Sequence, residues 1–285
     1  MPTKEEASGL RQSRPLTLFG VTPVFIRLPV DISPRGNTLN ARFLMAQVKQ
    51  NELLAYLFDR KPHRLSQPLA QWMTASPRFQ AFVETYRDKI RKKIRVTKGP
   101  DSVLDLQAEL ATAAWLVQER RFTVEYEKCG ASQTRCPDFS VTYTTSFSFN
   151  VEVTRMRTST ATGTDDAPKG EPGDNGRVAD IVCGKLGQML ANSINMLVIV
   201  TETDYLDTLD LPQIMVHLKQ RVEGHDPRIL GRHGFRDPAD FFKPYLRLSA
   251  VAVRDMAPDR PALLWANTEA KQPLPTPIRT ILQRK

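Results

Sequence analysis

Two carboxylates in the middle of the chain, Asp138 and Glu152, stand where they could bind a metal ion. Asp138 follows Pro137 at the start of one strand-like run, and Glu152 lies inside the next such run. Hard cations such as Mg²⁺ take one or two carboxylates together with waters and substrate phosphates. A bound ion lowers the pKa of the attacking water and neutralises charge that develops on a phosphate. The pair therefore indicates phosphodiester hydrolysis that depends on Mg²⁺ or Mn²⁺.

Three strand-like runs with alternating apolar residues must position these side chains. They are 122–126, 139–143 and 147–154. In the third run Glu152 and Thr154 leave the face opposite its apolar side chains, because neighbouring residues of a strand alternate in direction. Antiparallel pairing through a turn at 144–146 brings Asp138 near Glu152. We therefore expect the two carboxylates to converge.

Helices and a buried strand are expected around this meander. A helix at 102–120 carries Glu109 at the border of its apolar stripe, and a polar loop at 156–176 precedes a helix at 177–191. The apolar run 194–201 then reads as a strand buried on both faces, which completes a β-α-β crossover. Four further elements are expected, namely a helix at 211–223, strands at 246–254 and 262–265, and a short helix within 273–284 that packs on the sheet edge.

The order of these elements over residues 103–201 resembles the PD-(D/E)XK nuclease superfamily. The resemblance rests on a helix with Glu109, then Pro137-Asp138, then Val151-Glu152-Val153-Thr154, then a helix with Lys185 and Gln188 before an apolar strand. It implies an α/β, restriction endonuclease-like fold with a mixed central sheet flanked by helices. It also implies that Asp138 and Glu152 bind the metal ion and that Glu109 joins them.

One position departs from the family pattern. Two residues after the metal-binding Glu the family usually carries a catalytic lysine, and here that residue is Thr154. A threonine hydroxyl can orient a water or hydrogen-bond a phosphate, but it carries no charge. Members of the family can relocate the lysine to another element, and Lys185 is the candidate here. Gln188 shares the helical face of Lys185 and could hydrogen-bond a phosphate or a water.

The N-terminal third is expected to form a separate region. Residues 1–100 are predicted as an arm, with one extended run at 16–24, and a mainly helical region, while 101–285 form the core and its C-terminal strands and helix. The helical region comprises a helix at 39–59 and another that begins at Ser76-Pro77. The second helix runs into a basic segment that could contact phosphates of nucleic acid, or could equally be a solvated face. Its basic residues are Lys89, Arg91, Lys92, Lys93, Arg95 and Lys98.

Composition narrows the class of protein. The 285 residues carry 40 Lys and Arg against 31 Asp and Glu, and the net charge of +9 favours an anionic partner, nucleic acid first. No apolar run is long enough to span a bilayer, and residues 1–9 are not followed by the apolar segment of a secretory signal. We therefore expect a cytoplasmic protein. Cys129, Cys136 and Cys183 lack the paired spacing of zinc ligands and are expected to be free thiols. The four histidines show no zinc or triad spacing.

Three functions remain open on this basis. The first is a metal-dependent nuclease, endonuclease or exonuclease, that acts on DNA, with RNA as the less favoured substrate. The second is a degenerate member of the fold that binds nucleic acid or a protein without cleaving, for which the absent strand lysine is the support. The third is an α/β interaction module in which Asp138 and Glu152 are surface residues, and it predicts no metal affinity.

Overall fold

The computed structural model describes residues 34–129, 136–157, 174–201 and 203–284. The extended run expected at 16–24 and most of the loop expected at 156–176 lie outside these residues. Residues 1–45 and 46–285 form two compact units. Helix α1 (Pro34–Leu57) runs from the first unit into the second, and every later element belongs to the second.

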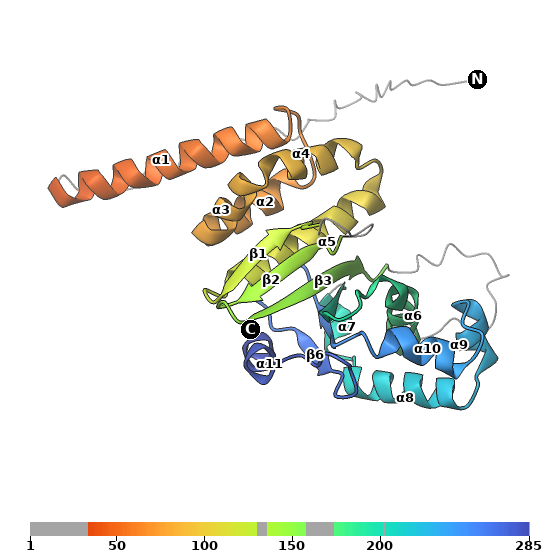
Figure 1. Cartoon of the computed structure of the whole chain (residues 1–285). Coiled ribbons are helices and arrows are strands. Elements are labelled where there is room, and N and C mark those ends of the chain that lie inside the picture. The colour runs from red at the N-terminus through yellow and green to blue at the C-terminus, as the bar shows by residue number, and fades with distance from the viewer. Residues whose placement is uncertain (1–33, 130–135, 158–173, 202, 285) are drawn as a thin grey trace, which may run out of the picture. The chain divides into compact units, whose positions relative to one another are not determined.

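A six-stranded mixed sheet forms the centre of the second unit (Figure 1). Its strands lie side by side in sequence order, as β1 (Phe122–Tyr126), β2 (Phe139–Tyr143), β3 (Phe147–Arg155), β4 (Ile194–Val200), β5 (Ala250–Arg254) and β6 (Leu263–Ala266). Strands β1 to β3 are antiparallel, β4 and β5 run parallel to β3 in register, and β6 returns antiparallel. This arrangement confirms the α/β class, the meander and the β-α-β crossover that the sequence predicts.

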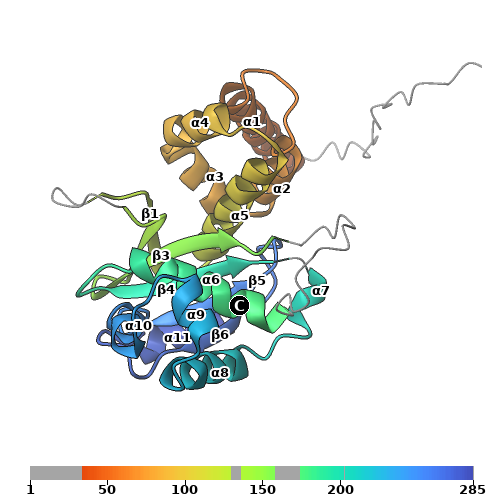
Figure 2. The same cartoon turned by 90° about the vertical axis from the view of Figure 1, so that its right-hand side faces the viewer.

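Helices cover both faces of the sheet (Figure 2). Helix α5 (Pro100–Val117) packs on one face. Helices α3 (Pro77–Thr85) and α4 (Arg87–Val96) lie against α5, and α2 (Ser66–Ala75) packs on α3. The other face carries α6 (Asp174–Lys185), the 3-10 turn η1 (Leu186–Gln188), α7 (Thr203–Leu206), α8 (Leu211–Glu223), α9 (Pro227–Arg232) and α10 (Pro238–Tyr245). Helix α11 (Thr276–Gln283) packs on the edge strand β6, as expected. None of the described helices is both long and apolar enough to cross a membrane.

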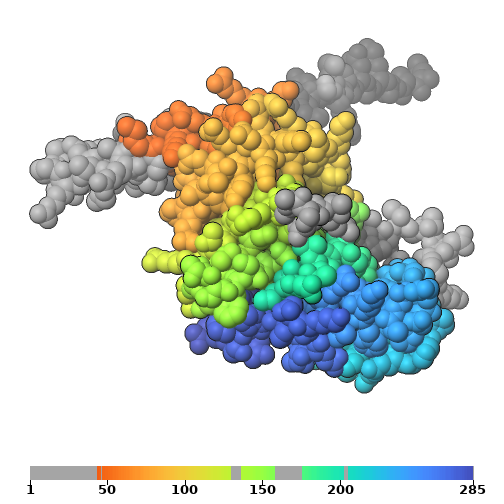
Figure 3. All heavy atoms as spheres, viewed as in Figure 1, coloured from red at the N-terminus to blue at the C-terminus, as the bar shows by residue number. Residues whose placement is uncertain are grey.

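The core has two layers because β4 and β5 are buried on both faces. Alternate side chains of β4 contribute to different clusters, with Val198 on the α5 side and Leu197 and Ile199 on the other. In β5, Ala252 and Val253 divide in the same way. Strand β4 is therefore the doubly buried strand that its continuous apolar run predicts. The space-filling view shows the β1–β3 meander between the N-terminal helices and the C-terminal helices (Figure 3).

Several element boundaries differ from the sequence prediction. The helix predicted from Ser76 into the basic segment breaks at Tyr86, whose ring packs against Phe82 and Tyr126. The helix predicted at 177–191 ends at Lys185 and continues as the turn η1, where Gly184 and Gly187 are weak helix formers. Strand β5 begins at Ala250 rather than near 246. Helices α2, α7, α9 and α10 were not predicted, since each is short and has few apolar repeats.

Gly99 is expected to be required at the start of α5. Its φ is 90°, a conformation that L side chains rarely adopt, and a Cβ added there would meet no atom within 4 Å. The cost of Gly99→Ala is therefore confined to the backbone, and we expect thermal or urea unfolding to show a loss of about 1–3 kcal/mol. Gly184→Ala is the matched control, because Gly184 lies inside α6 with equally open space and an ordinary φ. This control should gain stability; equal behaviour of the two variants would contradict the backbone argument.

Candidate functional site

A notch in the sheet marks the candidate site. Strand β2 pairs with β3 only from Tyr143 opposite Phe147 to Phe139 opposite Val151, whereas β3 continues to Arg155 beside β4. The predicted antiparallel pairing of the two strands is confirmed, and continuing its register by one residue would set Asp138 opposite Glu152. The Asp138 carboxylate accepts a hydrogen bond of 2.7 Å from the backbone N–H of Val153. The Asp138 side chain thus accepts the hydrogen bond of a β3 backbone N–H that lies beyond the end of β2.

The notch opens into a cleft of about 570 Å³ that receives side chains from both faces of the sheet. Glu109 of α5 and Lys93 of α4 reach it from one face. Thr154 of β3 and Lys185, the last residue of α6, reach it from the other. Asp138 lies between them at the end of β2. If β2 were as long as β3, the sheet would separate the side chains that come from its α5 face from those that come from its α6 face.

Two carboxylates of the cleft, Glu109 and Asp138, are half-buried and incompletely neutralised. Burial raises the pKa of Glu109, and the Asp138 charge raises it further, while the ammonium of Lys93 opposes both. Burial also raises the pKa of Asp138, against the Val153 N–H and the charges of Lys93 and Lys185. Lys93 forms ion pairs with Glu109 and, at 2.7 Å, with Glu127. Burial lowers the pKa of Lys93, but these two carboxylates outweigh it, so that its net pKa is raised.

Lys185 reaches the cleft that holds Asp138 and Thr154. Its Nζ donates a hydrogen bond of 3.1 Å to Oε1 of Gln188, which keeps the predicted proximity of the two residues although the helix ends between them. Within the described part of the chain Lys185 forms no ion pair at contact distance. Its positive charge therefore stays directed at the cleft, where it lowers the pKa of Asp138.

Glu152 and Arg155 lie on opposite faces of β3, and of the two only Arg155 lines the cleft. Glu152 is half-buried on the face opposite Val151 and Val153, and it is not among the described residues that line the cleft. Arg155 points to the α5 face, as the strand alternation predicts, and forms ion pairs with Asp101 and Asp105. The metal-binding role of Glu152 stays a prediction.

The basic segment is largely engaged within the fold. Lys89 Nζ donates to the backbone oxygens of Tyr126 and Glu127, at 2.8 and 3.2 Å, and Lys93 points into the cleft. The side chains of Arg91 and Arg95 both pair with Asp59. Lys92 and Lys98 are exposed and form no ion pair with a described residue. These last two are the cations of the segment best placed for phosphates outside the protein.

The prediction of three free thiols is wrong for two of them. Cys129 and Cys136 form a disulfide with their Cα atoms 4.8 Å apart, and Cys183 is free and buried. The register of β1 and β2 explains the bond, because Tyr126 pairs with Phe139 and three further steps along both strands set Cys129 opposite Cys136. The spacing of Cys129 and Cys136 in the sequence indicates a disulfide only once the register of the hairpin is known.

The cleft offers two carboxylates for a divalent cation but no larger set of ligands among the described residues. No three His, Cys, Asp or Glu side chains among the described residues are grouped to hold one ion. Glu109 and Asp138, however, are two half-buried carboxylates whose charges disfavour each other. Magnesium needs only one or two carboxylates when waters and a substrate phosphate complete its octahedron. A divalent ion beside Asp138 would relieve the repulsion that the fold leaves in place.

Comparisons with models of known protein families, with curated proteins and with solved structures find no match to this chain.

Asp138→Asn is expected to stabilise the metal-free protein at neutral pH. A carboxyl whose pKa is higher in the folded than in the unfolded state favours folding when protonated, and this contribution is lost as the pH rises through the folded pKa. Asparagine is neutral at every pH and can still accept the Val153 N–H. We expect a gain of about 1 kcal/mol at pH 8 that disappears as the pH falls below about 4. Thermal unfolding at both pH values measures it.

Asp105→Asn serves as the control for that experiment. Asp105 also lines the cleft, but it has cationic partners in Arg155 and Arg157. Its replacement removes ion pairs and should bring no gain in stability at either pH. A gain for Asp138→Asn that persists unchanged at pH 4 would contradict the electrostatic explanation.

Proposed function

We propose that this protein is a divalent-metal-dependent nuclease, with DNA as its first substrate and RNA as the second to test. The observation that carries the proposal is the position of Lys185, which lines one cleft with Asp138 and Thr154. Thr154 occupies the strand position where the resembled family carries its lysine. A lysine from the next helix thus supplies a positive charge at the place where the strand lacks one.

The roles of the residues follow from their chemistry. Asp138, with Glu109 or Glu152, would hold Mg²⁺ or Mn²⁺, and the bound ion would supply an activated water and charge neutralisation at the phosphate. Lys185 stabilises negative charge on the phosphoryl oxygens, because its ammonium lines the cleft and has no carboxylate of the described residues at contact distance. Thr154 can orient the attacking water through its hydroxyl, and Gln188 holds Lys185 through their hydrogen bond. The exposed Lys92 and Lys98 would contact the nucleic acid backbone beside the cleft.

The test is cleavage of plasmid, single-stranded DNA and RNA by the full-length protein in Mg²⁺, Mn²⁺ or EDTA. Metal-dependent cleavage that Glu152→Gln also weakens would support the proposal and give Glu152 a role as a ligand. Equal cleavage in EDTA would point to a contaminating or metal-independent enzyme and would contradict it.

A second candidate function is favoured by Lys93. Its ion pairs with Glu109 and Glu127 compensate carboxylate charge at the cleft without any metal ion. A protein that binds nucleic acid without cleaving it would need no more than this. Salt-sensitive DNA binding that is identical in Mg²⁺ and EDTA, with no cleavage of any substrate, would favour this candidate over the nuclease.

A further inference from the structure

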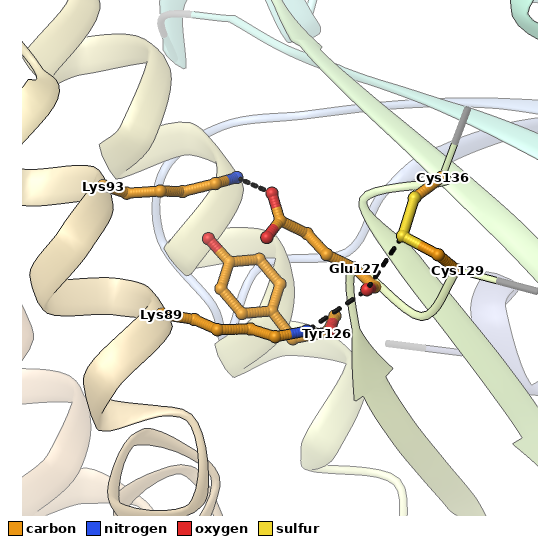
Figure 4. Close-up of a disulfide and its surroundings, with 6 residues drawn as sticks. All are labelled: Lys89, Lys93, Tyr126, Glu127, Cys129 and Cys136. Carbon is orange, nitrogen blue, oxygen red and sulfur yellow. Dashed lines mark hydrogen bonds and ion pairs between the residues drawn. A yellow bond between two sulfur atoms is a disulfide. The ribbon is translucent and has the colours of Figure 1, made fainter. Parts of the chain in front are cut away.

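The disulfide closes the β1–β2 hairpin close to Asp138, which lines the cleft. Cys136 is followed by Pro137 and then by Asp138, and on the other strand Cys129 follows Glu127 by two positions. Cys129 is exposed and Cys136 is half-buried, so a reagent in solution can reach the bond. In Figure 4 the bond lies beside Glu127, whose side chain extends toward Lys93.

We propose that the Cys129–Cys136 disulfide is a thiol–disulfide exchange site that controls how the hairpin presents Glu127 and Asp138 to Lys93. The exchange and its effect on the hairpin stand on the geometry alone. Only the consequence for cleavage rests on the proposed nuclease function.

Short contacts link the disulfide to the cleft. The backbone N–H of Glu127 donates to the carbonyl oxygen of Asp138 at 2.9 Å, which is the last hydrogen bond of the hairpin before the disulfide. The carbonyl of Glu127 accepts from Lys89, and its carboxylate pairs with Lys93, which also pairs with Glu109. Glu127, the first residue after β1, thus contacts Asp138, Lys89 and Lys93. The disulfide at Cys129 lies two residues further along the chain.

The bond is placed for local control rather than for global stability. Its cysteines are 7 positions apart in sequence, and cross-linking a short loop removes less entropy from the unfolded chain than cross-linking a long one. The rest of the sheet is joined by its own ladders and by two apolar clusters that do not include either cysteine. Reduction should therefore loosen the end of the hairpin and leave β3 to β5 intact.

The exchange needs a dithiol reductant as its partner. A thiolate of the dithiol attacks Sγ of Cys129, the sulfur–sulfur bond breaks, and Cys136 leaves as a thiolate that takes up a proton. The second thiol of the reductant then displaces Cys129, which also becomes a thiol, and the reductant leaves as its own disulfide. Two electrons pass to the protein in this balanced exchange. Cys183 takes no part, because it is buried and burial raises the pKa of its thiol to about 12.

The experiment compares the oxidised full-length protein with the same protein in dithiothreitol, under native conditions and without metal. Amide hydrogen exchange is followed at Glu127 and Val153, which report the hairpin end and the placement of Asp138. We expect reduction to accelerate exchange about tenfold at Glu127, with a smaller increase at Val153, and to leave Val198 of β4 unchanged. The double variant Cys129→Ser, Cys136→Ser should behave as the reduced protein does without any reductant.

Three results would overturn the inference. They are exchange at Glu127 that does not change on reduction, equal acceleration throughout the sheet, and a disulfide that dithiothreitol reduces only after the protein unfolds. Where the oxidised protein cleaves nucleic acid, the reduced form should cleave about tenfold more slowly, as for other lost supports of a metal site. If neither form cleaves, the proposed nuclease function fails, and the hydrogen-exchange result still decides the exchange site.

Discussion

Asp138→Asn should lower metal-dependent cleavage at least about 10³-fold, because it removes the charge that holds the ion and, through the ion, the activated water. The substitution is close to isosteric, and its amide oxygen can still accept the Val153 N–H. The protein should therefore fold normally and even gain stability at neutral pH. Initial cleavage rates at saturating Mg²⁺, together with Mg²⁺ titrations by calorimetry, measure the two effects separately.

Asp105→Asn controls for a general change in the charge of the cleft. Asp105 lines the same cleft but pairs with Arg155 and Arg157, so we do not expect it to hold the ion. Its loss should reduce cleavage less than about tenfold, as for a group outside the direct ligand set. If Asp138→Asn retains both its activity and its affinity for Mg²⁺, Asp138 is not a ligand and the nuclease proposal loses its basis.

Lys185→Met should lower kcat about 10²-fold and leave KM nearly unchanged, because its charge is required in the transition state more than for binding. Methionine keeps the unbranched apolar stem and removes the ammonium, so the packing at the end of α6 should survive. Lys185→Arg restores a positive charge in a different shape and should recover part of the rate. Single-turnover cleavage separates this chemical step from product release.

Lys92→Met is the matched control for Lys185. Lys92 is an exposed lysine of α4 without an ion pair among the described residues, and its proposed role is contact with the backbone of the nucleic acid. Its loss should raise KM and weaken the salt dependence of binding while kcat stays the same. Normal cleavage by Lys185→Met would show that Lys185 does not take the place of the lysine that β3 lacks. Lys93 would then be the next lysine to test.

The parts of the fold that the sequence predicts are those set by local pattern. Alternating apolar residues in β1, β2 and β3 leave one way to pair them around short turns, and continuing this pairing by one residue would set Asp138 opposite Glu152. The continuous apolar run of β4 likewise predicts burial on both faces. In each case the periodicity is long enough to outweigh local propensity.

The parts that the sequence does not predict depend on contacts between distant segments. Lys93 reads as one of six cations on a helix, and only the packing of α4 near the hairpin turns it toward Glu109 and Glu127. The break at Tyr86 depends on packing against Tyr126, which is remote in the chain. The Cys129–Cys136 spacing carries no meaning until the hairpin register is known.

The order of strands in the sheet has a kinetic consequence. Strands β1 to β3 pair with their neighbours through short connections, whereas β4 and β5 must each find a parallel partner across a crossover. Because ordering a long loop before its contacts form is entropically costly, the meander should assemble early and the parallel strands late. The nascent protein would then possess Asp138 before it possesses a positioned Lys185. Its candidate site would stay without that cation until the last strands of the sheet are in place.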